Sequence, residues 1–202
     1  MSLSNDELVR FWRKNAPLPL PYFDDRQVEL FFEDEEELLH FAAAIRSFLT
    51  LGPADRIADT MHLHAYYRDF TEDVGFDWVD PEMRHLAPGS PDIWHFVSPT
   101  SLGAMDSWDV RAKDRSKPYV VLEANCGWEV EHGLLMSWRE GVELVKVSGY
   151  DGHATNGHAY SDLSKDQYIY HSQRPERCTM NPAVVPPRQP RAFLRWPWKK
   201  GD

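Results

Sequence analysis

The sequence predicts an α+β fold, in which N-terminal helices pack on one face of a C-terminal antiparallel β-meander. Apolar residues recur at helical spacing in the first half of the chain, and they alternate with polar residues after Gly103. Glu140-Gly141 separates two strand-like segments, as in a β-hairpin. Helices followed by strands are typical of the α+β class. We expect one such domain over residues 1–154, followed by an irregular, basic, proline- and tryptophan-rich tail over 155–202 that packs on the body.

The first two helices are indicated by their capping residues. Ser4 and Glu7 form the pattern of a capping box ahead of a short apolar helix, which Pro17 ends. The clearest helix is predicted from Asp34 to Leu51, because an aspartate cap precedes three glutamates and the apolar residues form one wide stripe. Gly52 is expected to end this helix.

Weaker signals surround these two helices. A short strand or extended segment is expected around residues 27–32, where apolar and polar residues alternate. Pro53 suits the first turn of another helix, which we expect to run to about Phe70. A short helix is predicted to open at Ser90 and to end at Pro99.

His62-Leu63-His64 lies within the helix predicted after Pro53. On a strand, this spacing places two imidazoles on one face and is a common metal pair. On a helix, residues two positions apart point in directions about 200° apart. We therefore interpret both histidines as structural.

Four strands are predicted in the second half of the chain, and they make up the meander. They cover the segment around Trp108 to Arg111, then Tyr119–Ala124, Leu134–Arg139 and Val142–Val147. From Thr155 the alternation fades, and the stretch 182–197 is too rich in proline for regular structure.

Composition and charge narrow the classes of function. The net charge of −10 argues against nucleic acid as the main partner, because phosphate binding needs clustered cations. Two cysteines 52 positions apart form neither a disulfide framework nor a metal knuckle, so we expect a cytoplasmic protein. No apolar run approaches the ~18 residues needed to span a membrane, and no membrane partner is expected. Residues 171–202 carry seven Lys/Arg against two acidic residues, whereas residues 1–170 carry 15 Lys/Arg against 30.

One polar block, residues 125–133, interrupts two good strands. Such an interruption is typical of a long loop or bulge, and functional sites concentrate in such places. On an extended backbone, Glu129 and Glu131 share one face and His132 lies on the other. Asp151 and His153 follow the adjacent strand, so the two segments can approach each other.

These side chains lead to a metal hypothesis. Carboxylate oxygens and imidazole nitrogens are ligands for divalent ions, so the metal candidates are Glu129, Glu131, His132, Asp151 and His153. Glu131 is then the candidate general base, and His132 is a candidate for acid–base or ligand chemistry. No cofactor other than such a metal is expected.

A structural interpretation competes with the metal hypothesis. In it, Trp128 is buried, Glu131 accepts backbone N–H groups, His132 donates to a carbonyl, and the block is a rigid lock. Cys126 near His132 fits a thiol nucleophile, but a cysteine at the end of a strand is more often a small core residue. Gly133 completes the block as a structural residue. No phosphate loop, nucleophile elbow or dinucleotide motif is present, so whether the protein is an enzyme stays open.

The block also carries a resemblance to a known group of domains. The pattern C-x-W-[DE]-x-E-H-G, matched by residues 126–133, resembles a group of uncharacterised bacterial domains that also place helices before a β-meander. The likeness covers roughly residues 34–152. It implies no established enzyme activity, and related domains occur in collections that include toxin-immunity proteins.

Two functional hypotheses follow. The first is a non-enzymatic interaction domain, immunity-like in its role, that presents an acidic and aromatic face to a basic protein. The second is a metal-binding module or metal-assisted hydrolase centred on Glu129–His132. The substrate, the partner and the oligomeric state do not follow from the sequence.

Overall fold

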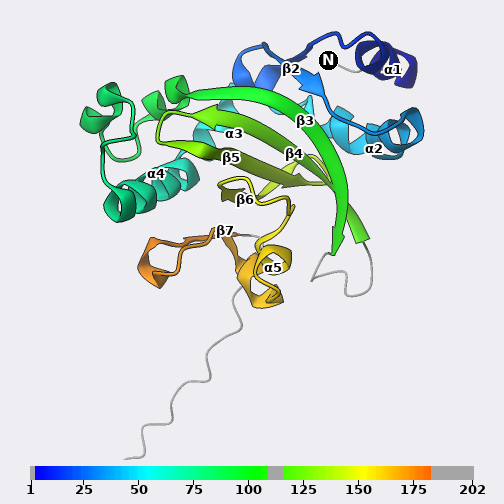
Figure 1. The fold of residues 1–202 in the computed structure, drawn as a ribbon. Coiled ribbons are helices and arrows are strands. Elements are labelled where there is room, and N and C mark those ends of the chain that lie inside the picture. The colour runs from blue at the N-terminus through cyan, green and yellow to red at the C-terminus, as the bar shows by residue number, and fades with distance from the viewer. Residues whose placement is uncertain (1–2, 109–115, 183–202) are drawn as a thin grey trace, which may run out of the picture.

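In the computed structural model, which describes residues 3–108 and 116–182, eight strands form one sheet in chain order (Figure 1). The strands are β1 (Leu18–Leu20), β2 (Arg26–Leu30), β3 (Val97–Trp108), β4 (Ser116–Cys126), β5 (Glu129–Arg139), β6 (Glu143–Ser148), β7 (Tyr168–Tyr170) and β8 (Thr179–Met180). Neighbouring strands are antiparallel except in the β2–β3 and β6–β7 pairs, which are parallel. The α+β class is confirmed, but the sheet is mixed and larger than the predicted meander.

In the described part of the chain, the α-helices precede β3, apart from one short helix after β6. They are α1 (Asn5–Arg13), α2 (Glu35–Phe48), α3 (Pro53–Ala58), α4 (Thr60–Val74) and α5 (Asn156–Ala159). The 3₁₀ segments are η1 (Pro21–Phe23), η2 (Pro81–His85), η3 (Pro91–Phe96), η4 (Leu163–Gln167) and η5 (Pro175–Arg177). Figure 1 shows α1 and α2 near one end of the sheet and α4 at the other. The capping predictions are confirmed: Ser4 and Glu7 form a complete capping box, and Asp34 accepts a hydrogen bond from the backbone N–H of Glu37.

Three local predictions in the first half were wrong. Gly52 does not end α2 but is the extended N-cap of α3. The helix predicted from Pro53 to Phe70 is two helices, which meet at Asp59. The segment after Ser90 is 3₁₀ rather than α-helical, and Pro99 lies inside β3. The sheet tolerates this proline because the register shifts between positions 99 and 101, and irregular positions of this kind accept proline.

Because Arg139 pairs with Glu143, Val142 also lies in the loop of the β5–β6 hairpin, which is confirmed at Glu140-Gly141. Both residues have positive φ, 51° and 74°, and the N–H of Val142 donates to the carbonyl of Arg139 at 3.1 Å. A Cβ added to Gly141 would lie 2.0 Å from the backbone oxygen of Ala44 in α2, so only glycine fits this turn. Of the strand predicted around Trp108, positions 109–111 lie outside the described residues.

The sheet has two unequal cores. Side chains from α1, α2 and α4 pack with one face of the central strands, represented by Leu122, Met136 and Trp138. The opposite face is smaller, with Tyr119, Val121, Leu135 and Val145 packed against Ala154, just before α5. The β2–β3 and β6–β7 pairs run in opposite directions along the sheet, so crossover connections of one handedness fall on opposite faces. This topology explains why both faces are covered.

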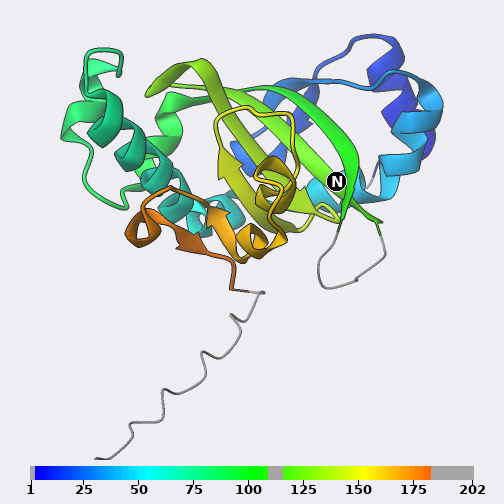
Figure 2. The same ribbon diagram turned by 60° about the horizontal axis from the view of Figure 1, so that its bottom comes forward.

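The prediction of irregular structure from residue 155 was wrong for residues 155–182. This segment contains α5, β7 and β8, and β7 joins the main sheet beside β6 (Figure 2). Strands of three and two residues are too short to show a period, which is why the alternation was not visible. The predicted tail packing of residues 183–202 lies outside the described residues. Among the described residues, no helix is both long and apolar enough to cross a membrane.

Candidate functional site

A hollow of about 620 Å³ opens between α4, the start of β5 and the end of β6. Five aromatic side chains line it: Tyr66, Phe70, Trp78, Tyr150 and Tyr160. Residues 129–132 of the polar block line the same hollow. We call it the aromatic hollow. The interruption noted in the sequence therefore lies at a depression that is rich in aromatic side chains.

The polar block forms a large bulge at the start of β5. Ala124 pairs with Leu134 and Cys126 pairs with Glu129, so one residue of β4 faces the four residues 130–133 of β5. Gly133 has a φ of 65°, and a Cβ added there would lie 2.7 Å from the carbonyl oxygen of Ala124. Glycine is therefore required at this position, because any side chain would clash with backbone. The predicted bulge is confirmed.

The carboxylate of Glu129 holds the bulge in place. Glu129 is 5% exposed, and its carboxylate accepts hydrogen bonds from the backbone N–H of Glu131 at 2.7 Å and of His132 at 3.0 Å. It also lies 3.1 Å from Nδ1 of His132 and accepts a longer hydrogen bond, 3.4 Å, from the hydroxyl of Tyr66. The lock proposed for this block therefore uses Glu129, and not Glu131, as the acceptor. A buried carboxylate needs such donors, because an unpaired buried charge is costly.

Two buried aromatic residues, Trp128 and Tyr66, pack together next to Glu129. Trp128 is fully buried and lies edge-on to Tyr66, with ring centroids 5.7 Å apart. The Tyr66 hydroxyl donates to the carbonyl of Gly133 at 3.1 Å, and burial raises its pKa, with Cys126 and Glu129 adding to the effect. Tyr66 is therefore a neutral hydrogen-bond donor at physiological pH.

Gly149 allows the end of β6 to approach this packing. A Cβ added to Gly149 would lie 2.9 Å from the Tyr66 hydroxyl and 3.5 Å from the Glu129 carboxylate. The backbone N–H of Tyr150 then donates to the carbonyl of His132 at 3.2 Å, which ties β6 to the bulge. The bottom of the aromatic hollow, which we call its floor, is therefore held by both the bulge of β5 and the end of β6.

Cys126 is not placed for nucleophilic chemistry. It is buried, and its thiol donates to the carbonyl of Glu129 at 3.4 Å. Burial raises the pKa of the Cys126 thiol to about 12, although hydrogen bonds with the backbone of Glu129 and Trp128 oppose the shift. The thiolate is the reactive form of cysteine, so this side chain is a small core residue.

The rim of the hollow is exposed. Glu131 and His132 extend from the bulge with exposed side chains, and among the described residues Glu131 makes no ion pair. Large apolar side chains on the rim are exposed too: Val74, Trp78, Val130, Tyr150 and Tyr160. Trp78 and Val130 are each 67% exposed. The hollow therefore has a rigid floor and an accessible, aromatic and acidic rim.

Asp151 and His153 form a separate cluster. The Asp151 carboxylate lies 2.6 Å from the ammonium nitrogen of Lys146, which is fully buried and also donates to the carbonyl of His153 at 2.9 Å. Burial lowers the pKa of Lys146, and the hydrogen bond and charge of Asp151 oppose that shift. Neither Asp151 nor His153 lines the aromatic hollow.

The five metal candidates do not form a ligand set. Among the described residues, no group of three or more His, Cys, Asp or Glu side chains is arranged to hold a metal ion. The Glu129 carboxylate accepts hydrogen bonds from backbone N–H groups, and the Asp151 carboxylate pairs with Lys146. His62 and His64 contact different groups. A ring nitrogen of His62 lies 2.8 Å from the Thr179 hydroxyl oxygen, and a ring nitrogen of His64 lies 2.9 Å from the carbonyl oxygen of Ser90.

A second hollow, of about 570 Å³, lies on the other side of α4. Its lining includes Arg68, Arg84 and Arg177, and we call it the arginine hollow. At 100° per residue, its lining positions on α4 point away from Tyr66 and Phe70 of the aromatic hollow. The two hollows therefore use different sides of one helix.

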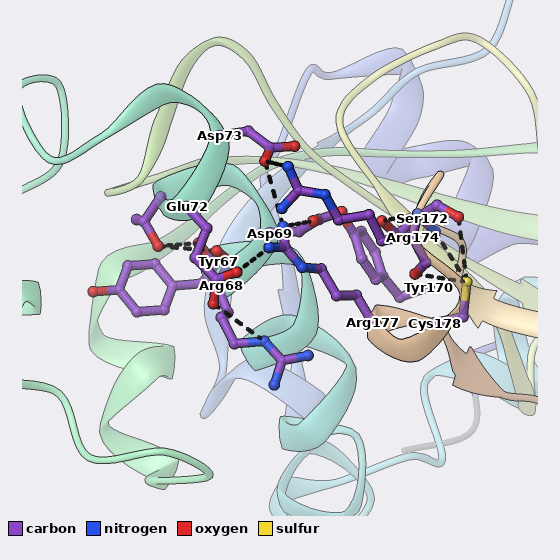
Figure 3. Close-up of polar contacts among 11 residues, drawn as sticks. Tyr67, Arg68, Asp69, Glu72, Asp73, Tyr170, Ser172, Arg174, Arg177 and Cys178 are labelled. Carbon is purple, nitrogen blue, oxygen red and sulfur yellow. Dashed lines mark hydrogen bonds and ion pairs between the residues drawn. The ribbon is translucent and has the colours of Figure 1, made fainter.

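An ion-pair cluster beside the arginine hollow ties the C-terminal segment to α4 (Figure 3). The guanidinium of Arg177 pairs with Asp69 and Glu72, and Arg174 pairs with Asp73 at 2.7 Å. The Tyr170 hydroxyl also donates to Asp69 at 2.7 Å. Burial raises the pKa of Asp69, but hydrogen bonds from Ser172, Arg177 and Tyr170 outweigh it and hold that pKa below its ordinary value. These charged side chains therefore pair with one another within the molecule.

The sequence did not single out several residues that define the aromatic hollow. Trp78, Tyr150 and Tyr160 lie on three different segments, and no spacing in the sequence relates them. The only available signal was the high content of aromatic residues, 13%. That signal suggested a pocket or partner surface but not its location.

Comparison with known proteins places the chain in one family. The family described as domain of unknown function DUF6985 matches residues 2–154, so the chain belongs to this family. No curated protein and no solved structure matches it significantly. The resemblance to an uncharacterised domain family is therefore confirmed.

Proposed function

We propose that this member of the DUF6985 family is a protein-interaction domain, and that the aromatic hollow binds a basic segment of a partner protein. The observation that carries the proposal is the set of exposed apolar side chains gathered at one acidic rim. Single exposed apolar residues are ordinary on a protein surface, whereas a contiguous group marks an interaction site. Here five such side chains border one depression.

The chemistry of the rim favours a cationic ligand. Trp and Tyr faces attract Lys and Arg side chains within about 6 Å of the ring centroid. The exposed carboxylate of Glu131 adds a negative charge to the lining that also contains Trp78 and Tyr160. The acidic chain as a whole, with a net charge of −10, would also steer a basic protein toward this surface.

The openness of the hollow favours a protein over a small molecule. Pockets for small molecules usually bury 70–90% or more of the ligand surface. Trp78 and Tyr160, two of the walls here, are 67% and 50% exposed. A broad aromatic surface of this kind matches the composition of protein interfaces, which are enriched in Tyr and Trp. An immunity role, in which the partner is a toxin, would be one instance of such binding.

The test is capture of a partner by immobilised full-length protein, compared between two charge reversals. Glu131→Lys changes the rim of the hollow, and Glu36→Lys makes the same change on the exposed side of α2. We expect wild type and Glu36→Lys to retain a stoichiometric basic protein at low salt, and Glu131→Lys to lose at least about tenfold in affinity for that protein after purification, or ~1.4 kcal/mol.

The salt dependence of the same purified complex is a second readout. Affinity should fall as the ionic strength rises from 0.05 to 0.5 M, because exposed charges are screened. Equal affinity of wild type and Glu131→Lys for the captured protein would contradict the proposal. So would the absence of any captured basic protein at every salt concentration.

A further inference from the structure

We propose that the aromatic hollow has an intramolecular ligand, residues 186–198 of the same chain, which a partner must displace. The inference rests on the proposed function, since it assigns a regulator to the same site. Residues 186–198 read Pro-Pro-Arg-Gln-Pro-Arg-Ala-Phe-Leu-Arg-Trp-Pro-Trp. They lie beyond the described residues, and their sequence has the chemistry that the hollow would bind.

The proline content of residues 186–198 suits the aromatic lining of the hollow. Residues 186–198 contain four prolines. Proline restricts φ to about −65°, and proline-rich sequences favour the polyproline II conformation. Segments of this kind dock into grooves lined by aromatic side chains, because little conformational entropy is lost on binding. Tyr66, Phe70, Trp78, Tyr150 and Tyr160 provide such a lining.

The C-terminal residues and the rest of the chain also carry opposite net charges. Residues 183–202 carry five Lys/Arg and one Asp, a net charge of +4, whereas residues 1–182 carry 17 Lys/Arg and 31 Asp/Glu, a net charge of −14. Three arginines, Arg188, Arg191 and Arg195, are interspersed with the prolines and aromatic residues. Each can stack on an aromatic ring while its charge faces an acidic side chain.

Acidic side chains continue beyond the hollow. A smaller depression of about 210 Å³ shares Tyr150 with the aromatic hollow. It adds the carboxylates of Glu33 and Glu123 and the ring of Phe31, which is 76% exposed. An extended basic segment that crosses Tyr150 would therefore meet acidic and aromatic groups on both sides of it.

The C-terminal residues are also long enough to reach the aromatic hollow. The described chain ends at Pro182, just after β8, and the N–H of Asn181 donates to the carbonyl of Gln167 at 2.7 Å. This end lies near the hollow, because β8 pairs with β7 and the ring of His171 after β7 packs on Tyr160, 4.5 Å between centroids. Twenty further residues extend up to about 66 Å. That length exceeds the diameter of a domain of this size, about 40 Å.

The arginine hollow is the less favourable destination. Arg68, Arg84 and Arg177 line it against two glutamates, so a segment with three arginines would meet a surplus of like charge there. Its acidic neighbours Asp69 and Glu72 are already paired with Arg177. Charge complementarity therefore favours the aromatic hollow over the arginine hollow as the binding site for this segment.

Limited trypsin digestion of the full-length chain tests the inference directly. The segment offers cleavage sites after Arg188, Arg191 and Arg195, and binding in the hollow protects them. We expect cleavage at these sites to be at least tenfold faster in the double variant Trp78→Ala/Glu131→Lys than in wild type. The matched control Phe76→Ala/Glu36→Lys, with the same changes on exposed residues outside the hollow, should keep the wild-type rate.

A peptide titration separates this inference from the proposed function. A synthetic peptide of residues 183–202 should bind full-length Arg188→Glu/Arg191→Glu/Arg195→Glu at least tenfold more tightly than wild type, because the competing segment no longer fills the hollow. Equal cleavage rates in wild type and the hollow variant, or no peptide binding to either protein, would overturn the inference. Partner capture that still depends on Glu131 would in that case leave the proposed function standing.

The concentration of the protein distinguishes an intramolecular ligand from binding between copies. Protection from trypsin that stays constant on hundredfold dilution supports the intramolecular form. Protection that disappears on dilution would overturn it, since the segment would then occupy the hollow of a second copy.

Discussion

The two hollows beside α4 are similar in volume but differ in how their charges are used. In the arginine hollow, Arg177 pairs with Asp69 and Glu72 and so joins the C-terminal segment to the helix. In the aromatic hollow, the buried carboxylate of Glu129 is satisfied by backbone, while Glu131 stays exposed in the lining that also contains Trp78. The paired charges therefore belong to a structural contact, whereas the exposed charge and exposed rings are the features that support the proposed binding surface.

The same contrast appears within the aromatic hollow itself. Trp128 lies under the floor and is fully buried, whereas Trp78 lies on the rim and is 67% exposed. Both tryptophans are large, and only their burial separates them. The comparison predicts that one of them determines stability and the other determines binding.

The largest expected effect is that of Trp128→Ala. Removal of a buried indole leaves a cavity and should lower the free energy of unfolding by about 3–5 kcal/mol. Trp78→Ala should change it by less than about 0.5 kcal/mol, as is usual for surface substitutions. Urea denaturation of both variants measures the difference. Similar losses of unfolding free energy in the two variants would contradict the distinction between a structural floor and an exposed rim.

A pH effect is expected on the other side of α4, where His62 contacts Thr179 of β8. Burial lowers the pKa of His62 to about 4 from an ordinary value of 6.5. Between these pH values the unfolded chain binds a proton that the folded chain does not, so stability is complete above pH 6.5 and falls toward pH 4. The expected loss is on the order of 2–3 kcal/mol.

Denaturation curves of wild type and His62→Asn between pH 4 and 8 measure this contribution. Asparagine keeps a polar group near Thr179 but does not titrate in this range. The difference in stability between the two proteins should therefore change with pH between 4 and 6.5 and be constant above 7. A difference that is independent of pH would show that His62 does not titrate as its burial implies.

The smallest expected effect is that of divalent metal ions. Glu129 accepts backbone N–H groups and Asp151 pairs with Lys146, so neither carboxylate is available without loss of these contacts. Added Zn²⁺, Mn²⁺, Mg²⁺ or Ca²⁺ should leave the unfolding temperature of chelator-treated protein unchanged. Stabilisation of about 2.7 kcal/mol, the effect of a ligand at 100 times its dissociation constant, would restore the metal hypothesis.

The features predicted correctly from the sequence are local ones. The caps at Ser4 and Asp34, the turn at Glu140-Gly141 and the bulge around Gly133 each depend on a few neighbouring residues. Capping and turn chemistry act over three or four positions, so a single sequence contains the necessary information. The location of the candidate site at the polar block follows from the same local signal.

The features missed by the sequence depend on distant contacts. The parallel pairing of β6 with β7 rests on Val147 and Tyr170, 23 positions apart. The aromatic hollow joins Trp78 to Tyr150 and Tyr160, and no periodicity links these residues. Likewise, the choice of Glu129 over Glu131 as the buried carboxylate depends on how the bulge curls. Such details are decided by packing, which propensities do not encode.

The most direct test of the account is to measure binding and stability on the same variant of the rim. In Trp78→Ala, the affinity for the purified basic partner should fall at least tenfold, while the free energy of unfolding changes by less than about 0.5 kcal/mol. Phe76→Ala, which alters an exposed ring at the arginine hollow, should leave both quantities near their wild-type values. Unchanged affinity in Trp78→Ala, or an equal loss of affinity in both variants, would contradict the assignment of the aromatic hollow as the binding surface.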